Sequence, residues 1–256
     1  MAKRLRLAAN ISHLFTELDL PDRIKAAADA GFDGVEILSP YDHPAPDLRD
    51  KAVWAGLPIV LINCPPPNYT GGEPGYAAIP ALAERFRRDF ARVQRYAQVL
   101  GAGIVHVMSG VAEGPEARQT LIGNLRWACA QAPKLRISLE PLNRQDFPGY
   151  FLNDYNLARD IVAEVEAPNL IVQFDAYHAQ MLTGDALGVW KAVSDIAGHV
   201  QLGDAPGRGA PGSGDIDFPS LIAAIRDSGY SGWVSAEYAP GPDTSKTLDW
   251  MPLVAG

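Results

Sequence analysis

The chain of 256 residues carries 22 basic and 30 acidic side chains, which give a formal net charge of −8. Its length is typical of one (β/α)8 barrel, and its acidic balance argues against a protein that holds duplex DNA through phosphate contacts. The two cysteines, Cys64 and Cys129, lie far apart and form no metal-binding CxxC pair. Because no segment has the apolar length of a signal peptide or a membrane span, we expect a cytoplasmic protein without membrane or nucleic-acid partners.

Strand-like and helix-like segments alternate along the whole chain. The predicted strands are 5–10, 34–38, 58–62, 103–107, 136–140, 170–174, 198–202 and 232–236. Helical patterns separate them, at about 21–30, 47–55, 81–100, 115–131, 153–167, 185–195 and 219–227. Strands that alternate with helices favour a parallel sheet, and eight of them in a chain of this length predict a single TIM barrel over 1–256.

One long irregular segment interrupts this alternation. Residues 64–79 contain the runs Pro65-Pro66-Pro67 and Gly71-Gly72 and show no helical or strand periodicity. A structureless loop of this length inside a compact domain usually has a function. We therefore predict a lid or active-site loop here, and a partner-contact arm is the alternative.

Four of the later strands deliver a side-chain oxygen near their C-terminal ends, on the face opposite their aliphatic residues. These residues are Glu140, Asp175, Gln201 and Glu237. Successive side chains of a strand point to opposite faces, and the C-terminal strand ends of a TIM barrel meet at its active site. We therefore expect the four side chains to point into the barrel and to converge.

Three carboxylates and one amide oxygen form an oxygen-only site, which suits Mg²⁺ or Mn²⁺ better than zinc. Without a cation, clustered carboxylates repel one another and some take up protons. Any one of these residues could simply cap its strand or pair with an arginine. Their alignment on successive strands favours a metal site made by Glu140, Asp175, Gln201 and Glu237.

Several motifs resemble the hydroxypyruvate isomerase family of the xylose isomerase-like barrels, a family that includes 2-oxo-tetronate isomerases. They are 9–12 (ANIS), 138–143 (SLEPLN), 174–180 (FDAYHAQ), 198–201 (GHVQ), 211–216 (PGSGDI) and 232–238 (GWVSAEY). The resemblance implies a divalent metal on the four oxygen-bearing residues and proton exchange with substrate by Glu140 and Glu237. It also implies that His178 and Arg208 contact substrate oxygens.

The remaining candidates each have a structural alternative. His178 is placed to polarise a carbonyl group, and Arg208 lies in a glycine-rich loop from which it can bind a carboxylate bidentately. Asn10 and Asn143 either contact substrate or serve polar packing. Three further polar residues on inward-facing strand positions are expected to be hydrogen-bonded parts of the barrel interior rather than metal ligands: Glu36, His106 and His199.

The residues favour transfer of a carbonyl group between adjacent carbons through an enediolate, with two carboxylates as base and acid and a metal as Lewis acid. The simplest reaction converts hydroxypyruvate to tartronate semialdehyde, so the expected partner is a small hydroxy-oxo acid. A 2-oxo-tetronate isomerase is the first alternative and a ketose 3-epimerase the second, less favoured because related epimerases tend to have histidine in place of Gln201. An apurinic-site endonuclease would need a histidine-rich zinc cluster. A non-catalytic sugar-acid binding barrel would predict loss of the two glutamates, and homo-oligomer formation is left open.

Overall fold

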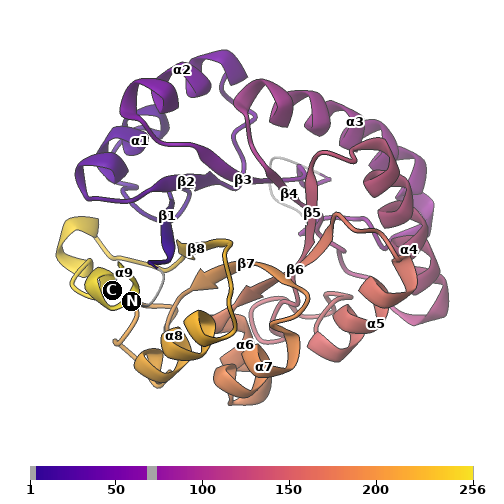
Figure 1. The fold of residues 1–256 in the computed structure, drawn as a ribbon. Helices are drawn as coiled ribbons and strands as arrows, with labels where there is room; N and C mark the ends of the chain where they lie inside the picture. Colours follow the sequence, from indigo (N-terminus) through magenta and orange to yellow (C-terminus); the bar gives the residue numbers. More distant parts are fainter. Residues whose placement is uncertain (1–3, 68–73, 256) are drawn as a thin grey trace.

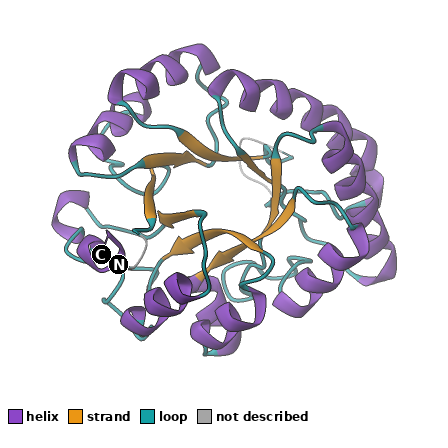
Figure 2. Ribbon diagram, viewed as in Figure 1, coloured by secondary structure: helices purple, strands orange, loops and turns teal. Residues whose placement is uncertain are grey.

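The computed structural model describes residues 4–67 and 74–255. Parallel strands β1 to β8 follow one another around a closed barrel, and the helices lie outside them (Figures 1 and 2). Pairing of the first and last strands closes the barrel, with Arg6 opposite Trp233 and Ala9 opposite Ala236. The (β/α)8 fold predicted from the alternation of strands and helices is therefore confirmed.

The strands and most helices lie close to their predicted positions. The strands are β1 Arg6–Asn10, β2 Gly34–Ile37, β3 Ile59–Asn63, β4 Ile104–His106, β5 Arg136–Leu139, β6 Leu170–Asp175, β7 Ala197–Leu202 and β8 Trp233–Ala236. The helices are α1 Leu20–Asp29, α2 Ala45–Ala55, α3 Ala83–Leu100, α4 Gly114–Gln131, α5 Tyr155–Val165, α6 Ala176–Thr183, α7 Ala186–Val193, α8 Phe218–Asp227 and α9 Met251–Ala255. Short 3-10 turns occur at η1 Pro80–Leu82 and η2 Thr244–Thr247. Helices α6 and α9 were not predicted, because α6 follows β6 without an intervening loop and the five residues of α9 are too few for a clear helical period.

Helix α3 illustrates how the outer ring packs on the barrel. Its buried side chains recur every three or four residues, which places them on one face: Phe86, Phe90, Val93, Ala97 and Leu100. The ring of Phe90 lies 5.9 Å from that of Phe86 and 5.8 Å from that of Trp127 on α4. This stripe joins α3 to its neighbour and to the core. Within the described ranges, no helix has both the length and the apolar character needed to cross a membrane.

The barrel interior is apolar at the N-terminal ends of the strands and polar at their C-terminal ends. A cluster of Ala8, Val60, Leu61, Ile104 and Ile171 fills the N-terminal end, with Trp233 packed against it. A Cβ atom at Gly34 would lie 2.9 Å from Val60 Cγ2 and 3.1 Å from the Trp233 ring, so this position has no room for a side chain. The buried polar side chains therefore collect at the opposite end, where barrel active sites lie.

Part of the predicted lid, residues 68–73 of the segment 64–79, lies outside the described residues. Beyond that gap the chain is packed against the barrel. Tyr76 is buried, and the backbone N–H of Ala78 donates to the carbonyl oxygen of Ser109 at 2.8 Å. The final residues of the segment are thus fixed to the loop after β4, and a lid function for the whole segment stays a prediction.

The packing of α3 makes a prediction about stability. Phe90→Ala should lower the free energy of unfolding by about 3–5 kcal/mol, because it removes a fully buried ring and leaves a cavity between two helices. Urea unfolding followed by circular dichroism measures the change. Trp54 on α2 is 72% exposed, so Trp54→Ala should alter the same free energy by less than about 0.5 kcal/mol. Similar losses in the two variants would contradict the assigned burial.

Candidate active site

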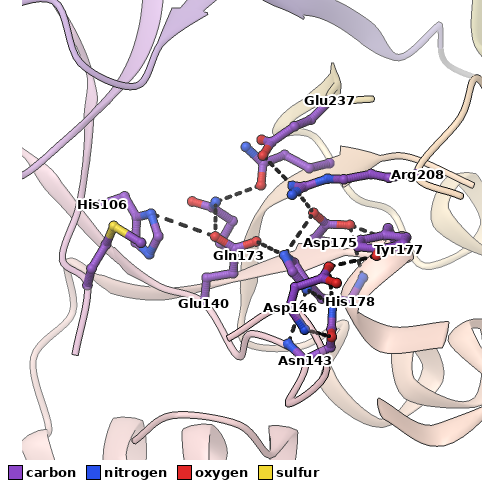
Figure 3. Close-up of polar contacts among 12 residues, drawn as sticks. His106, Glu140, Asn143, Asp146, Gln173, Asp175, Tyr177, His178, Arg208 and Glu237 are labelled. Carbon is purple, nitrogen blue, oxygen red and sulfur yellow. Dashed lines mark hydrogen bonds and ion pairs between the residues drawn. The ribbon is translucent and has the colours of Figure 1, made fainter. Parts of the chain in front are cut away.

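The four predicted metal ligands lie at the C-terminal ends of successive strands. Glu140 follows β5, Asp175 ends β6, Gln201 lies on β7 and Glu237 follows β8. Glu140 and Glu237 are each 5% exposed, and the other two are fully buried. Figure 3 shows the carboxyl groups of Asp175 and Glu237 at the guanidinium group of Arg208, with Glu140 beside Gln173 and His178. Barrel closure therefore brings together residues that are about one βα unit apart in the sequence.

Each glutamate is held by an amide through one carboxylate oxygen. Gln173 Nε2 donates to Glu140 Oε2 at 2.9 Å. Asn10 Nδ2 donates to Glu237 Oε2, also at 2.9 Å. Glu140 Oε1 has no hydrogen-bond partner among the described residues and lies 4.0 Å from His178 Nε2. Both glutamates line a cavity of about 140 Å³, so one oxygen fixes the side chain of Glu140 while the other is available to a ligand.

Burial makes the charges of these carboxyl groups unfavourable. Desolvation, together with repulsion from Asp175 and Glu237, raises the pKa of Glu140 well above its usual range. Desolvation also raises the pKa of Asp175 to about 7, although the charge of Arg208 acts in the opposite direction. The cluster therefore retains protons near neutral pH when no cation is bound, and a bound cation would release them.

Arg208 brings positive charge to the carboxylates. Its Nη2 atom lies 2.6 Å from Glu237 Oε1 and 3.4 Å from Asp175 Oδ2. The guanidinium carbon lies over the ring of Tyr177, 5.1 Å from its centroid. Burial alone would lower the pKa of Arg208, but the carboxylates of Glu237 and Asp175 raise it. The arginine predicted from its glycine-rich loop is thus a half-buried, charged part of the site.

The loop that carries Arg208 is held by a residue that the sequence did not single out. Asp204 is buried, and its carboxylate accepts the backbone N–H groups of Gly212, Gly214 and Ile216 at 2.9, 2.7 and 3.1 Å. A Cβ atom at Gly214 would lie 2.1 Å from a backbone oxygen, so glycine is required where the loop folds back on itself. The sequence feature that could have identified Asp204 is its position as an acidic residue at the start of a glycine-rich loop.

His178 lies in the first turn of α6 and is oriented by Asn143. Its Nδ1 atom accepts the backbone N–H of Asn143 at 3.1 Å and the side-chain N–H at 2.9 Å. Burial, followed by the charge of Arg208, lowers the pKa of His178 well below its usual range, so the ring is neutral. The ring proton is therefore on Nε2, which lies 3.9 Å from Asp175 Oδ2. Although His178, Glu140 and Asp175 are close enough to resemble a metal-ligand triad, this protonation makes His178 a hydrogen-bond donor.

The two asparagines predicted to contact substrate have protein partners at both ends of their amides. Asn143 donates to His178, and its Oδ1 accepts two backbone N–H groups of the following turn at 3.0 and 2.9 Å. Asn10 donates to Glu237, and its Oδ1 accepts the backbone N–H of Ser12 at 3.1 Å. These contacts favour an orienting role, and direct contact with substrate stays a prediction for both residues.

The three interior polar residues lie inside the barrel as expected. His199 contacts the carboxylate of Glu36, and both side chains are fully buried. His106 Nδ1 lies 3.7 Å from Glu140 Oε2. Burial, and then the charge of His199, lower the pKa of His106 to about 3, so its ring is neutral. The expectation of hydrogen bonding was wrong for His106 and for His199, because no ring nitrogen of either residue has a hydrogen-bond partner among the described residues.

The cavity wall also contains residues to which the sequence assigned no role. His13, in the turn after β1, places its Nε2 atom 3.6 Å from Glu237 Oε1. Phe147 forms part of the wall, and its ring centroid lies 5.8 Å from that of His178. Gln173 shares its strand face with Asp175, which predicted its inward direction but none of its contacts. Residues in turns have no periodic signal, which explains why His13 and Phe147 were missed.

Comparison with known proteins places this site in a family. A family model described as "Xylose isomerase-like TIM barrel" matches residues 24–253. A 2-oxo-tetronate isomerase of Cupriavidus necator is 40% identical over 254 residues, which cover 96% of this chain and 97% of the relative. A hydroxypyruvate isomerase of Escherichia coli is 36% identical over 253 residues, with 96% and 98% covered.

A solved structure described as AP endonuclease, family 2, from Brucella melitensis is 35% identical, has a TM-score of 0.94 and covers 98% of this chain and 100% of that one. The curated relatives are named isomerases and match nearly the whole chain. They confirm the resemblance to the hydroxypyruvate isomerase family and identify an enzyme of the isomerase class. The chain belongs to the xylose isomerase-like TIM-barrel family.

Proposed function

We propose that this enzyme moves the carbonyl group of a small hydroxy-oxo acid to the neighbouring carbon, most simply converting hydroxypyruvate to tartronate semialdehyde. The observation that carries the proposal is the pair formed by Glu140 and Glu237, each tethered by Oε2 to an amide at the wall of one cavity. The names of the relatives from Cupriavidus necator and Escherichia coli support the same class of substrate.

The two glutamates divide the proton transfers between them. One carboxylate removes a proton from the hydroxyl-bearing carbon, which leaves an enediolate, and the other carboxyl returns a proton to the former carbonyl carbon. The hydroxyl proton passes to the new hydroxyl oxygen, so substrate and product are isomers and no oxidant or reductant is required. A raised pKa makes Glu140 a stronger base than an exposed glutamate, and such acid–base groups typically contribute about 10²–10⁴-fold to the rate.

His178 and Arg208 would bind the substrate between these glutamates. The Nε2–H group of His178 points toward the carboxylates, where it can donate to a substrate carbonyl oxygen. Arg208 can offer its planar guanidinium group to the substrate carboxylate. Its present partners, Asp175 and Glu237, would then need another positive charge nearby.

We propose that a divalent cation, Mg²⁺ or Mn²⁺, provides that charge. The donor set fits a hard cation because Glu140, Asp175 and Glu237 are buried carboxylates whose mutual repulsion is relieved by positive charge. Gln201 Oε1 accepts one hydrogen bond, from Gln173 at 2.6 Å, and a carbonyl oxygen has a second lone pair for a metal. When bound, the cation would stabilise negative charge on the substrate oxygens.

Isomerisation of 2-oxo-tetronate is the second candidate, supported by the name of the relative that is 40% identical. A four-carbon acid offers the same carbonyl, hydroxyl and carboxylate groups to the site. Epimerisation of a ketose is less favoured because Gln201 replaces the expected histidine and Arg208 suits an acid. The acidic donor set and the net charge of −8 argue against cleavage of DNA, and the presence of both glutamates argues against a purely binding role. A cytoplasmic location, homo-oligomer formation and the absence of membrane or nucleic-acid partners stay predictions.

The proposed reaction can be followed directly. Protein incubated in D₂O with Mg²⁺ and either hydroxypyruvate or 2-oxo-tetronate should isomerise the acid and incorporate deuterium at the reacting carbons, as observed by NMR. EDTA should abolish both changes, and Glu140→Gln or Glu237→Gln should lower kcat by at least about 10²-fold because each removes one acid–base group. The relative rates would rank the two acids. Failure to isomerise or exchange either acid would refute the proposed substrate class.

The cation should stabilise the protein more at high pH. The raised pKa values of Glu140 and Asp175 mean that the metal-free folded state holds protons that the unfolded state loses above about pH 4. Their contribution to stability is therefore present below that pH and lost as pH rises through about 7. Thermal unfolding with EDTA or excess Mn²⁺ should give a larger rise in Tm at about pH 8 than at about pH 6.

The variant Asp175→Asn removes one of the titrating groups, and one proposed cation ligand, at nearly constant volume. It should reduce both the size and the pH dependence of the Mn²⁺ effect. The same rise in Tm at both pH values in the parent protein would contradict proton release on cation binding.

A further inference from the structure

A buried chain of hydrogen bonds joins the two glutamates beneath the cavity, and Glu36 of β2 is at its centre. We propose that Glu36 is a positioning residue that fixes which end of the Gln201 amide faces the active site and that also holds the NH₂ group of Asn10. Its effect on cation binding rests on the proposed function. Its effect on side-chain orientation follows from the contacts themselves.

Glu36 is fully buried, and both of its carboxylate oxygens face other side chains of the barrel interior. Its Oε2 atom accepts Gln201 Nε2 at 2.9 Å and Asn10 Nδ2 at 3.2 Å. Its Oε1 atom contacts His199 Nε2 on β7. A buried carboxylate with so many interior partners is unfavourable in itself and strongly destabilising when a partner is lost, so its presence calls for a specific role.

That role follows from the symmetry of an amide group. The oxygen and nitrogen of an amide side chain have nearly the same size, so packing alone does not select one orientation. A carboxylate accepts hydrogen bonds and donates none. Glu36 therefore requires the NH₂ end of Gln201 to face it, which turns Gln201 Oε1 toward the other side chains of the active site.

The orientation of Gln201 passes to Glu140 through Gln173. Gln201 Oε1 accepts one N–H of Gln173 at 2.6 Å, and the second N–H of the same group donates to Glu140 Oε2 at 2.9 Å. Ser138 Oγ donates to Gln173 Oε1 at 3.0 Å, which fixes the other end of that amide. Reversal of Gln201 would place two NH₂ groups against each other and break this link.

Asn10 makes the corresponding link to Glu237. One N–H of its amide faces Glu36, and Asn10 Nδ2 also donates to Glu237 Oε2. The carboxylate of Glu36 is thus linked through one amide to Glu237, which follows β8, and through two amides to Glu140, which follows β5, without contacting the cavity. Gln201, a proposed cation ligand, presents oxygen rather than nitrogen for the same reason.

Glu36→Gln tests this assignment because it keeps the shape and adds a donor, which permits the amide of Gln201 to reverse and weakens the hold on Asn10. Metal-free protein is titrated with MnCl₂ alone, and free Mn²⁺ is measured by electron paramagnetic resonance. The Kd for Mn²⁺ should rise about 10–100-fold, as is typical when a partner of a metal ligand is lost. At saturating Mn²⁺, kcat should fall while KM changes little, because Glu36 does not contact substrate.

Ser235→Ala is the matched control. Ser235 is also fully buried inside the barrel, and its hydroxyl has no hydrogen-bond partner among the described residues. This variant should bind Mn²⁺ like the parent protein. Circular dichroism compares the Tm of every variant, so that a loss of folding is separated from a loss of orientation.

An unchanged Mn²⁺ affinity in Glu36→Gln would overturn the proposal, and so would a lower Tm with unchanged affinity, which indicates a merely structural residue. If Glu36→Gln does not fold, the Mn²⁺ titration of Gln173→Met tests the proposal instead. This substitution breaks the hydrogen-bond link to Glu140 without changing a charge. Unchanged affinity in that variant overturns the proposal, and weakened affinity supports it. Absence of Mn²⁺ binding in the parent protein refutes the metal site and this inference together, an outcome distinct from equal binding by parent and variant.

Discussion

Closing eight parallel strands into a barrel forces their C-terminal ends together, and three of those ends carry carboxylates. Glu140, Asp175 and Glu237 thereby share one buried space, where ionised groups are unfavourable unless they are compensated. The protein compensates with the guanidinium group of Arg208, with amide N–H donors and with raised pKa values. A divalent cation would neutralise the same charge more completely. Burial, together with mutual repulsion, raises the pKa of Glu140 and of Asp175, so the cost of assembling the site and the proposed basicity of Glu140 have one origin.

The division of the barrel interior into two halves allows this unfavourable cluster to persist. The apolar residues around Trp233 fill the N-terminal half, and the outer helices bury stripes such as that of α3. Most of the hydrophobic stabilisation therefore comes from parts of the molecule that do not contact the cavity. Function and stability occupy opposite ends of the same strands, as in other barrels of this kind.

Residues that do not contact the cavity control the ones that do. Glu36 directs the amides that hold the two glutamates, Asn143 directs the ring proton of His178, and Asp204 holds the loop that carries Arg208. Each acts through hydrogen bonds whose direction is set by an acceptor or donor that cannot exchange roles. Buried polar side chains that do not contact the cavity thus decide which atoms of the active-site residues face the substrate.

The fold class, the order of the elements and the inward direction of Glu140 and Asp175 could all be predicted from the sequence. These features follow from local periods of two and about 3.6 residues, which each segment expresses alone. The short helix α6 was missed because it follows β6 directly, with no loop to mark its start. The partners of each inward side chain, in contrast, could not be predicted from the sequence. The contacts of Gln173 depend on the register of β6 with β7, which shifts next to Val172. Such contacts join residues far apart in the chain, and their geometry exists only once the barrel has closed.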